Sequence, residues 1–290
     1  MTTAHNTPED QQSLWQSPEA AQAWRRNAAT RMQLLGPATE RMLALANIGE
    51  GCHVLDIAAG TGDQTILAAR RVGPRGRVVA TDISPDMLAV AAGQARQAGL
   101  TNITTQVLDA QHLDFPAETF DAVISRQGLM FIPNLVQALS RMWQVLKSGG
   151  TLAATVWSTP EHNPVFALPF AIARSYAGLP EMAAGEPGLF ALGTPELLTD
   201  ALHAAGFRDV MVEAIALHYE YPSAAAFMDA RKETAGPLLT IIERLSPADR
   251  ERVWAEIAAA LRQFEGPQGF AAPGEILLVR GSKQHAPGSE

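Results

Sequence analysis

Hydrophobic and polar positions along residues 50–157 form a repeating pattern. Short runs rich in Val, Ile and Leu, each bounded by turn residues, predict strands at residues 54–57, 77–81, 103–108, 120–125 and 151–157. Stretches rich in Ala, Leu and Arg between them predict helices at residues 64–72, 85–98 and 135–146. Strands that alternate with helices of this length form βαβ units, so the pattern predicts an α/β fold around a mostly parallel sheet.

The pattern changes after Trp157. Residues 158–195 contain scattered proline and glycine residues and apolar patches, which indicates an insertion or lid and not another strand–helix unit. Regular patterns then return, and they predict a helix at 195–205, a strand at 210–217, two or three helices within 224–264 and a last strand at 276–280.

We expect residues 1–290 to form a single domain. Its expected parts are an N-terminal helical lid (1–45), a ligand-binding core (46–157), an insertion or lid (158–205) and a C-terminal part of the sheet with inserted helices (206–282).

The segment after the first predicted strand is suited to bind a ligand through its backbone. Residues 58–63 read A-A-G-T-G-D, and Gly60 and Gly62 place no side chain between the loop and a ligand. A dinucleotide fingerprint would need a third glycine at position 65, where this chain has Thr65. Asp56, at the tip of the strand, suits an ammonium group, such as the methionine end of S-adenosylmethionine (SAM), better than a pyrophosphate.

Acidic residues also end the next two predicted strands. Asp82 is placed to accept hydrogen bonds from both hydroxyls of a ribose. Asp109, which precedes Ala110, is placed to accept a hydrogen bond from an adenine amino group. Each acid taken alone is equally well explained as a cap of the following helix. Three acids at three successive strand ends favour SAM over NAD as the cofactor.

Several segments resemble the successive motifs of class I SAM-dependent methyltransferases, namely residues 56–63, Asp82, residues 109–110, residues 120–121 and residues 145–150. The similarity is greatest to the ubiquinone/menaquinone-biosynthesis C-methyltransferase group and related small-molecule enzymes. The resemblance implies a Rossmann-like, seven-stranded, mostly parallel sheet whose last strand is antiparallel. Residues 125–128, Ser-Arg-Gln-Gly, depart from the quinone enzymes.

The resemblance also implies roles for individual residues. Gly60, Thr61 and Gly62 would line the methionine part of SAM, and Asp82 the ribose. The remaining cofactor contacts, at the adenine and on the sulfonium side, would come from Ile83, Met87, Asp109, Ala110, Ser125 and Arg126.

The composition narrows the class of acceptor. A net charge of −8 disfavours nucleic acid, and Arg25, Arg26 and Arg31 are expected to form a solvated helix face. Cys52 is the only cysteine, which fits a cytoplasmic protein, and the seven histidines have no metal-ligand spacing, so we expect no metal. No secretory signal and no apolar run of membrane-spanning length is visible. The oligomeric state is not indicated.

We therefore expect transfer of a methyl group from SAM to a carbon or oxygen of a small, largely apolar acceptor, such as an aromatic, quinone or polyketide-like molecule. His162 is the candidate general base, and Arg126 is placed to steady a developing enolate or phenolate. The expected lining of the acceptor site is Trp15, Trp24, Met130, Phe131, Trp157, Phe166, Phe170 and Phe190.

Two other functions remain open on the sequence alone. One is a SAM-binding protein without methyl transfer, because the cofactor motifs report binding and not catalysis. The other is a nucleotide-cofactor oxidoreductase built on a similar sheet.

Overall fold

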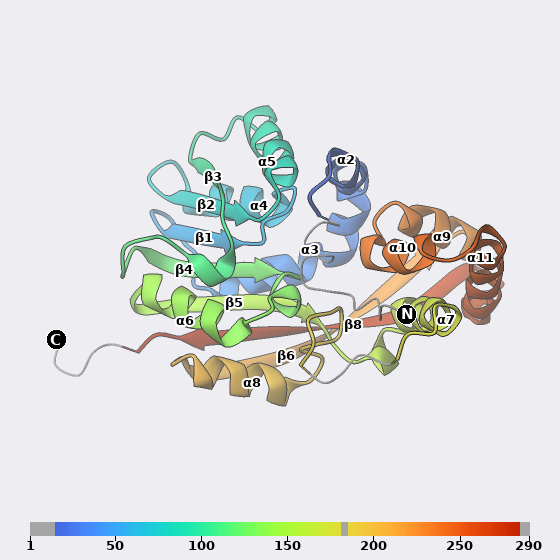
Figure 1. Ribbon diagram of the computed structural model, residues 1–290. Helices are drawn as coiled ribbons and strands as arrows, with labels where there is room; N and C mark the ends of the chain where they lie inside the picture. Colours follow the sequence, from blue (N-terminus) through green and yellow to red (C-terminus); the bar gives the residue numbers. More distant parts are fainter. Residues whose placement is uncertain (1–14, 181–184, 285–290) are drawn as a thin grey trace.

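An eight-stranded sheet, in which seven strands follow the order β3-β2-β1-β4-β5-β8-β6, forms the centre of the computed structural model, which describes residues 15–180 and 185–284 (Figure 1). The strands are β1 (His53–Ile57), β2 (Arg77–Asp82), β3 (Ile103–Val107), β4 (Phe120–Arg126), β5 (Leu146–Trp157), β6 (Arg208–Tyr221) and β8 (Gly269–Ser282). A two-residue strand, β7 (Glu265–Gly266), pairs with β8 alone. Strands β1 to β5 are parallel, and β8 is antiparallel to both β5 and β6. The predicted α/β class and its antiparallel last strand are confirmed.

Both faces of the sheet are covered by helices. Neighbouring residues of one strand belong to different hydrophobic clusters: Val54 packs in the cluster with α3 (Ala28–Leu45) and α4 (Asp63–Val72), and Leu55 in the cluster with α6 (Leu135–Val145) and α8 (Pro195–Ala204). Because successive side chains of a strand point to opposite faces, this separation requires apolar residues at consecutive positions. The continuous apolar runs of the sequence arise from that double burial.

Two further helices precede or flank this core. Helix α2 (Pro18–Arg26) contacts α5 (Pro85–Gln97) and begins at Ser17, whose hydroxyl accepts a hydrogen bond from the amide of Ala20. Ser84 caps α5 in the same way, through the amide of Met87. A serine before a proline at the first helical position predicts such a start, and the structure confirms it at Ser84.

The remaining helices form a cap at one end of the sheet. The segment after β5 contains α7 (Pro164–Tyr176), and three helices connect β6 to β7 and β8: α9 (Ala224–Lys232), α10 (Gly236–Glu243) and α11 (Pro247–Leu261). Helix α7 packs against α10 and α11, and Figure 1 shows the four helices grouped together. Among the described residues, no helix is both long and apolar enough to cross a membrane.

Asn163 attaches this cap to the sheet. Its wholly buried side chain accepts a hydrogen bond from the backbone amide of Glu275 on β8 and donates to the carbonyl of Glu275, both at 3.0 Å. The same amide group donates to Ser158 Oγ and to the carbonyl of Thr159, each at 3.1 Å. The start of α7 is thereby fixed to the β6–β8 pair.

We expect Asn163→Ala to lower the free energy of unfolding by roughly 2–4 kcal/mol, because the partly buried amide of Glu275 loses its acceptor and the Glu275 carbonyl loses one of its two donors. Urea denaturation followed by circular dichroism measures the change. Gln97→Ala, at an exposed position on α5, is the control and should stay within about 0.5 kcal/mol of the parent. Equal effects of the two substitutions would contradict the assigned role of Asn163.

Candidate functional site

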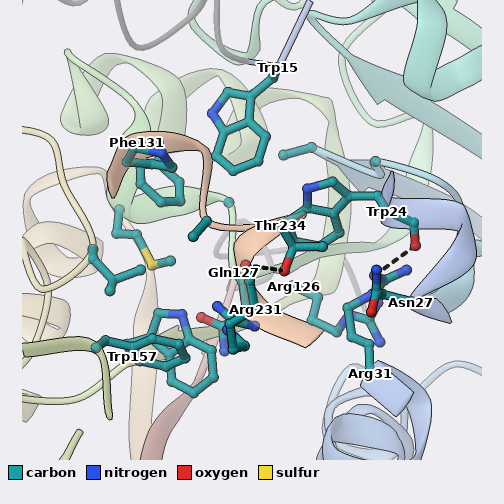
Figure 2. A pocket seen from close by; sticks show the side chains of 18 of the residues that line it. Trp15, Trp24, Asn27, Arg31, Arg126, Gln127, Phe131, Trp157, Arg231 and Thr234 are labelled. Carbon is teal, nitrogen blue, oxygen red and sulfur yellow. Dashed lines mark hydrogen bonds between the residues drawn. The ribbon is translucent and has the colours of Figure 1, made fainter. Parts of the chain in front are cut away.

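A cavity of about 310 Å³ lies where the carboxyl ends of β1, β2, β4 and β5 face the cap. One side is formed by the loop after β1 and the ends of β2 and β3. The other side is formed by side chains of α7, α9, α10 and α11 together with Trp157. Figure 2 shows this aromatic side, with Trp15 and Trp24 from the N-terminal segment opposite Trp157. Open α/β sheets bind ligands at this edge.

The loop between β1 and α4 requires left-handed backbone angles. Gly60 has φ +56° and Gly62 has φ +87°. A Cβ on Gly62 would lie 2.8 Å from the Cβ of Ala91 on α5, whereas a Cβ on Gly60 would meet no atom within 4 Å. Gly62 is therefore needed for packing, and Gly60 leaves the loop open toward the cavity. Gly60 and Thr61 line the cavity, and Gly62 does not.

Asp56 lies beneath this loop and does not line the cavity. It is wholly buried, and its carboxylate accepts hydrogen bonds from Thr65 Oγ1 at 2.5 Å and Gln64 Nε2 at 3.1 Å. Burial raises the pKa of Asp56 to about 7, against the smaller opposing effect of these two donors. The carboxylate thus ties the first turn of α4 to β1. A direct contact with an ammonium group stays a prediction that this geometry does not favour.

Asp82 holds the same loop from its other side. Its Oδ2 accepts a hydrogen bond from the amide of Gly60 at 2.8 Å, and its Oδ1 from the amide of Ser84 at 2.9 Å. Burial raises the pKa of Asp82, while these backbone donors favour its charged form. The carboxylate lines the cavity next to Ile83 and Met87.

Asp109 is both a cap and a cavity residue. Its Oδ1 accepts a hydrogen bond from the amide of Gln111 at 2.8 Å, which begins the short 3₁₀ helix Ala110–His112. Asp109 and Ala110 also line the cavity. The acidic strand ends, Asp82 and Asp109, and the open glycine loop therefore converge on one wall, and their donor and acceptor groups fit an adenosine bearing a charged amino-acid tail.

Ser125 and Arg126, the two residues at the end of β4 that were expected to contact the cofactor, differ in their position relative to the cavity. Ser125 is buried, its hydroxyl has no partner, and it does not line the cavity. Arg126 does line the cavity, but its Nη2 lies 2.9 Å from Asp63 Oδ2 and its Nη1 lies 3.2 Å from Thr39 Oγ1. Gln127, which the sequence analysis did not select, also lines the cavity.

His162 lies outside the cavity lining. Its Nδ1 is 2.7 Å from Glu275 Oε1, and its side chain is 60% exposed. A role as general base stays a prediction, and in this conformation it is not supported by contact with the cavity. Of the side chains expected around the acceptor, all line the cavity except Phe190.

Comparison with known proteins agrees with this geometry. Residues 48–184 match the family described as methyltransferase domain. The chain is 29% identical over 270 residues to nocamycin O-methyltransferase of Saccharothrix syringae, covering 90% of this chain and 96% of that enzyme. It is 37% identical over 118 residues to demethylmenaquinone methyltransferase of Listeria welshimeri, covering 41% of this chain and half of that enzyme. The chain is a class I SAM-dependent methyltransferase.

Solved structures share the fold of this methyltransferase. A Bacillus halodurans protein assigned as a methyltransferase superposes with a TM-score of 0.58 at 20% identity, covering 85% of this chain and 98% of that one. Phosphoethanolamine N-methyltransferase 2 of Haemonchus contortus, solved with SAM, superposes with a TM-score of 0.51 at 20% identity, covering 85% of this chain and 53% of that one. The cofactor of this methyltransferase is SAM, in agreement with the sequence analysis.

A buried charge cluster joins the N-terminal helices of the methyltransferase to its cofactor loop. Asp63, the first residue of α4, accepts from Arg126 and also from Arg31 on α3, whose Nη2 is 2.7 Å away. Arg31 further donates to Thr61 Oγ1 at 3.2 Å, and its guanidinium lies 4.6 Å from the ring of Trp24. The prediction that Arg31 belongs to a solvated helix face is wrong, because its side chain is only 11% exposed.

The described residues contain no group of three His, Cys, Asp or Glu placed to hold a metal.

Removal of the shared carboxylate should be costly. We expect Asp63→Ala to lower the free energy of unfolding by roughly 3–5 kcal/mol, since two buried guanidiniums lose their counter-charge. Guanidinium chloride denaturation measures this change. The matched control is Glu233→Ala, which removes the partner of the exposed Arg26 and should cost less than about 1 kcal/mol. A loss at Asp63 no larger than that of the control would refute the structural importance of the cluster.

Asp56 should make stability depend on pH in a defined window. Because the folded pKa of Asp56, about 7, lies above the ordinary value of 3.8 for this carboxyl group, the folded state keeps a proton that the unfolded chain releases. This contribution is complete below pH about 4 and is lost as the pH rises to about 7. We expect Asp56→Asn, which is neutral throughout, to gain stability relative to the parent across this window in thermal unfolding. Asp114→Asn, at an exposed position, controls for the change in charge, and a difference independent of pH at Asp56 would contradict its raised pKa.

Proposed function

We propose that the methyltransferase methylates a carbon or oxygen of a small, largely apolar acceptor of aromatic, quinone or polyketide-like structure. The observation that supports this most is the shape of the cavity: one wall carries the cofactor groups and the facing wall is built mainly from apolar and aromatic side chains. A flat apolar molecule held against that wall would lie close to the cofactor.

The proposed cofactor placement follows the groups on the wall. The open loop at Gly60 and Thr61 would hold the methionine part, Asp82 the ribose hydroxyls, and Ile83 and Met87 the adenine face, with Asp109 at its edge. When bound, SAM supplies a methyl group on a sulfonium, and the electron pair of the broken carbon–sulfur bond stays on sulfur as the acceptor forms its new bond.

The protein's own part in the reaction is then mostly positioning. Its residues orient the acceptor toward the methyl group and keep water away. Arg126 remains a candidate for stabilising negative charge that develops on the acceptor, although its guanidinium is already paired with Asp63. His162 remains the candidate base for acceptors that must lose a proton.

We further propose that the N-terminal helices and the 158–205 insertion act as a lid over the cavity within a single domain. Trp15 and Trp24 on one side and Phe166 and Phe170 on the other line the cavity and support this division. The net charge of −8 supports a free small molecule and not nucleic acid as the acceptor, and the single cysteine supports a cytoplasmic location.

Calorimetric titration with S-adenosylhomocysteine, followed by a labelled-methyl assay across phenols, quinones and polyketides, tests the proposal. We expect cofactor binding and transfer of label to at least one of these classes. Gly62→Ala should weaken cofactor binding about tenfold or more, because the new Cβ meets Ala91 and displaces the loop.

The matched control is Gly99→Ala, which carries a similar left-handed strain at φ +69° but meets no atom within 4 Å at the end of α5. It should leave cofactor affinity unchanged. Cofactor binding without label transfer to any of the three classes would reject the proposed acceptor and favour a SAM-binding protein without methyl transfer.

A further inference from the structure

Three polar side chains that line the cavity have unused hydrogen-bonding groups. They are Gln127 after β4, Tyr219 on β6 and Arg231 on α9. Figure 2 shows Gln127 and Arg231 among the side chains around it. Buried polar groups in folded proteins are normally paired, so each unpaired group calls for an explanation.

Arg231 carries a charge without a counter-charge. Within the described part of the chain, no carboxylate lies within 4.0 Å of its guanidinium, and no hydrogen bond leaves its side chain. Its contact is with an aromatic face, 4.7 Å from the centroid of Phe166. Burial lowers the pKa of Arg231, which expresses the cost of holding this charge away from water.

The other buried arginines of the cavity differ in this respect. Arg31 and Arg126 both pair with Asp63, at 2.7 Å and 2.9 Å. Each of these two arginines therefore has a carboxylate partner before any ligand binds, although the single carboxylate leaves the cluster with one positive charge in excess. Arg231, which is partly buried, is left as the cation of the cavity that lacks a protein partner among the described residues. An unpaired charge shielded from water is costly unless a ligand pairs with it.

Gln127 and Tyr219 provide neutral groups near this charge. Both polar atoms of the Gln127 side chain are buried without a partner, and its φ of +59° is unusual for a residue other than glycine. The Tyr219 hydroxyl is also buried without a partner, and burial raises its pKa, so it stays a neutral donor. The Tyr219 ring packs edge-on against Phe166, the ring that also supports Arg231.

We infer that the acceptor carries an acidic oxygen group, bound as an anion by Arg231, with Gln127 and Tyr219 pairing with carbonyl or hydroxyl oxygens beside it. This inference rests on the proposed function, because it describes the acceptor of the same site. The aromatic walls bind the body of the molecule, and the three polar groups select those acceptors that are acidic.

The acidic oxygen can belong to a carboxylate or to an ionised enol or phenol, and two pairs of probes separate these sources. The first pair is anthraquinone-2-carboxylate and anthraquinone-2-carboxamide. The second is 2-hydroxy-1,4-naphthoquinone, which is ionised at neutral pH, and 2-methoxy-1,4-naphthoquinone. Binding is followed by quenching of the tryptophan fluorescence, because Trp15, Trp24, Trp157 and Trp254 line the cavity. Titrations of the full chain with and without saturating S-adenosylhomocysteine require no turnover.

We expect the parent protein to bind at least one anion roughly tenfold or more tightly than its neutral partner, the ratio associated with a hydrogen bond to a charged group. Arg231→Met should abolish this preference while leaving the affinity for the neutral probe within about twofold. Arg231→Lys should retain part of the preference, since the charge remains. Arg262→Met, at an exposed position at the end of α11, is the matched control and should retain it fully.

Equal binding of anion and neutral partner in both pairs by the parent protein would overturn the inference, whether or not the variants fold. So would a preference that survives in Arg231→Met, or a failure of both anions to bind. Binding of S-adenosylhomocysteine, measured separately, distinguishes failure of this inference from failure of the proposed function.

Discussion

The shared carboxylate of Asp63 is the interaction on which the arrangement of the site depends. Arg31 approaches it from α3 and Arg126 from the end of β4, while Asp63 itself begins α4 directly after the cofactor loop. Three segments that are distant in the sequence are thereby held at one buried point. Since a carboxylate between two guanidiniums leaves one positive charge in excess, this cluster adds a net positive charge beside the cavity, opposite in sign to the carboxylates of Asp82 and Asp109 that line it.

The charged groups of the cavity are divided between its two walls. The cofactor wall contributes the carboxylates of Asp82 and Asp109, and the cap wall contributes Arg231 with no acidic residue beside it among the described residues. A bound sulfonium would add a further positive charge between the two walls. An acceptor with an anionic oxygen, as inferred above, would place its negative charge between Arg231 and that sulfonium, so the proposed preference would rest on charge pairing of the kind seen at Asp63.

The strands, and the acidic residues at their ends, could be predicted from the sequence because those signals are local. Apolar runs mark strands buried on both faces, and acids at the ends of parallel strands must meet at one edge. The ends of the strands were harder to predict from the sequence. Strand β8 begins at Gly269, well before the predicted residue 276, because its pairing with β6 extends across Pro273 and Gly274. The Asp63–Arg31 pair gave no signal, since nothing near either residue in the chain indicates the other.

The strand-end acids also show why capping and ligand binding are not competing explanations. An ionised carboxylate offers about four lone-pair sites. Asp82 accepts hydrogen bonds from the backbone amides of Gly60 and Ser84, and these bonds fix the orientation of the carboxylate at the edge of the cavity. The remaining lone pairs could accept the ribose hydroxyls of the proposed cofactor placement, in a direction fixed by the backbone bonds. In that placement the amide bonds would position the ligand contact, and loss of either one would loosen it.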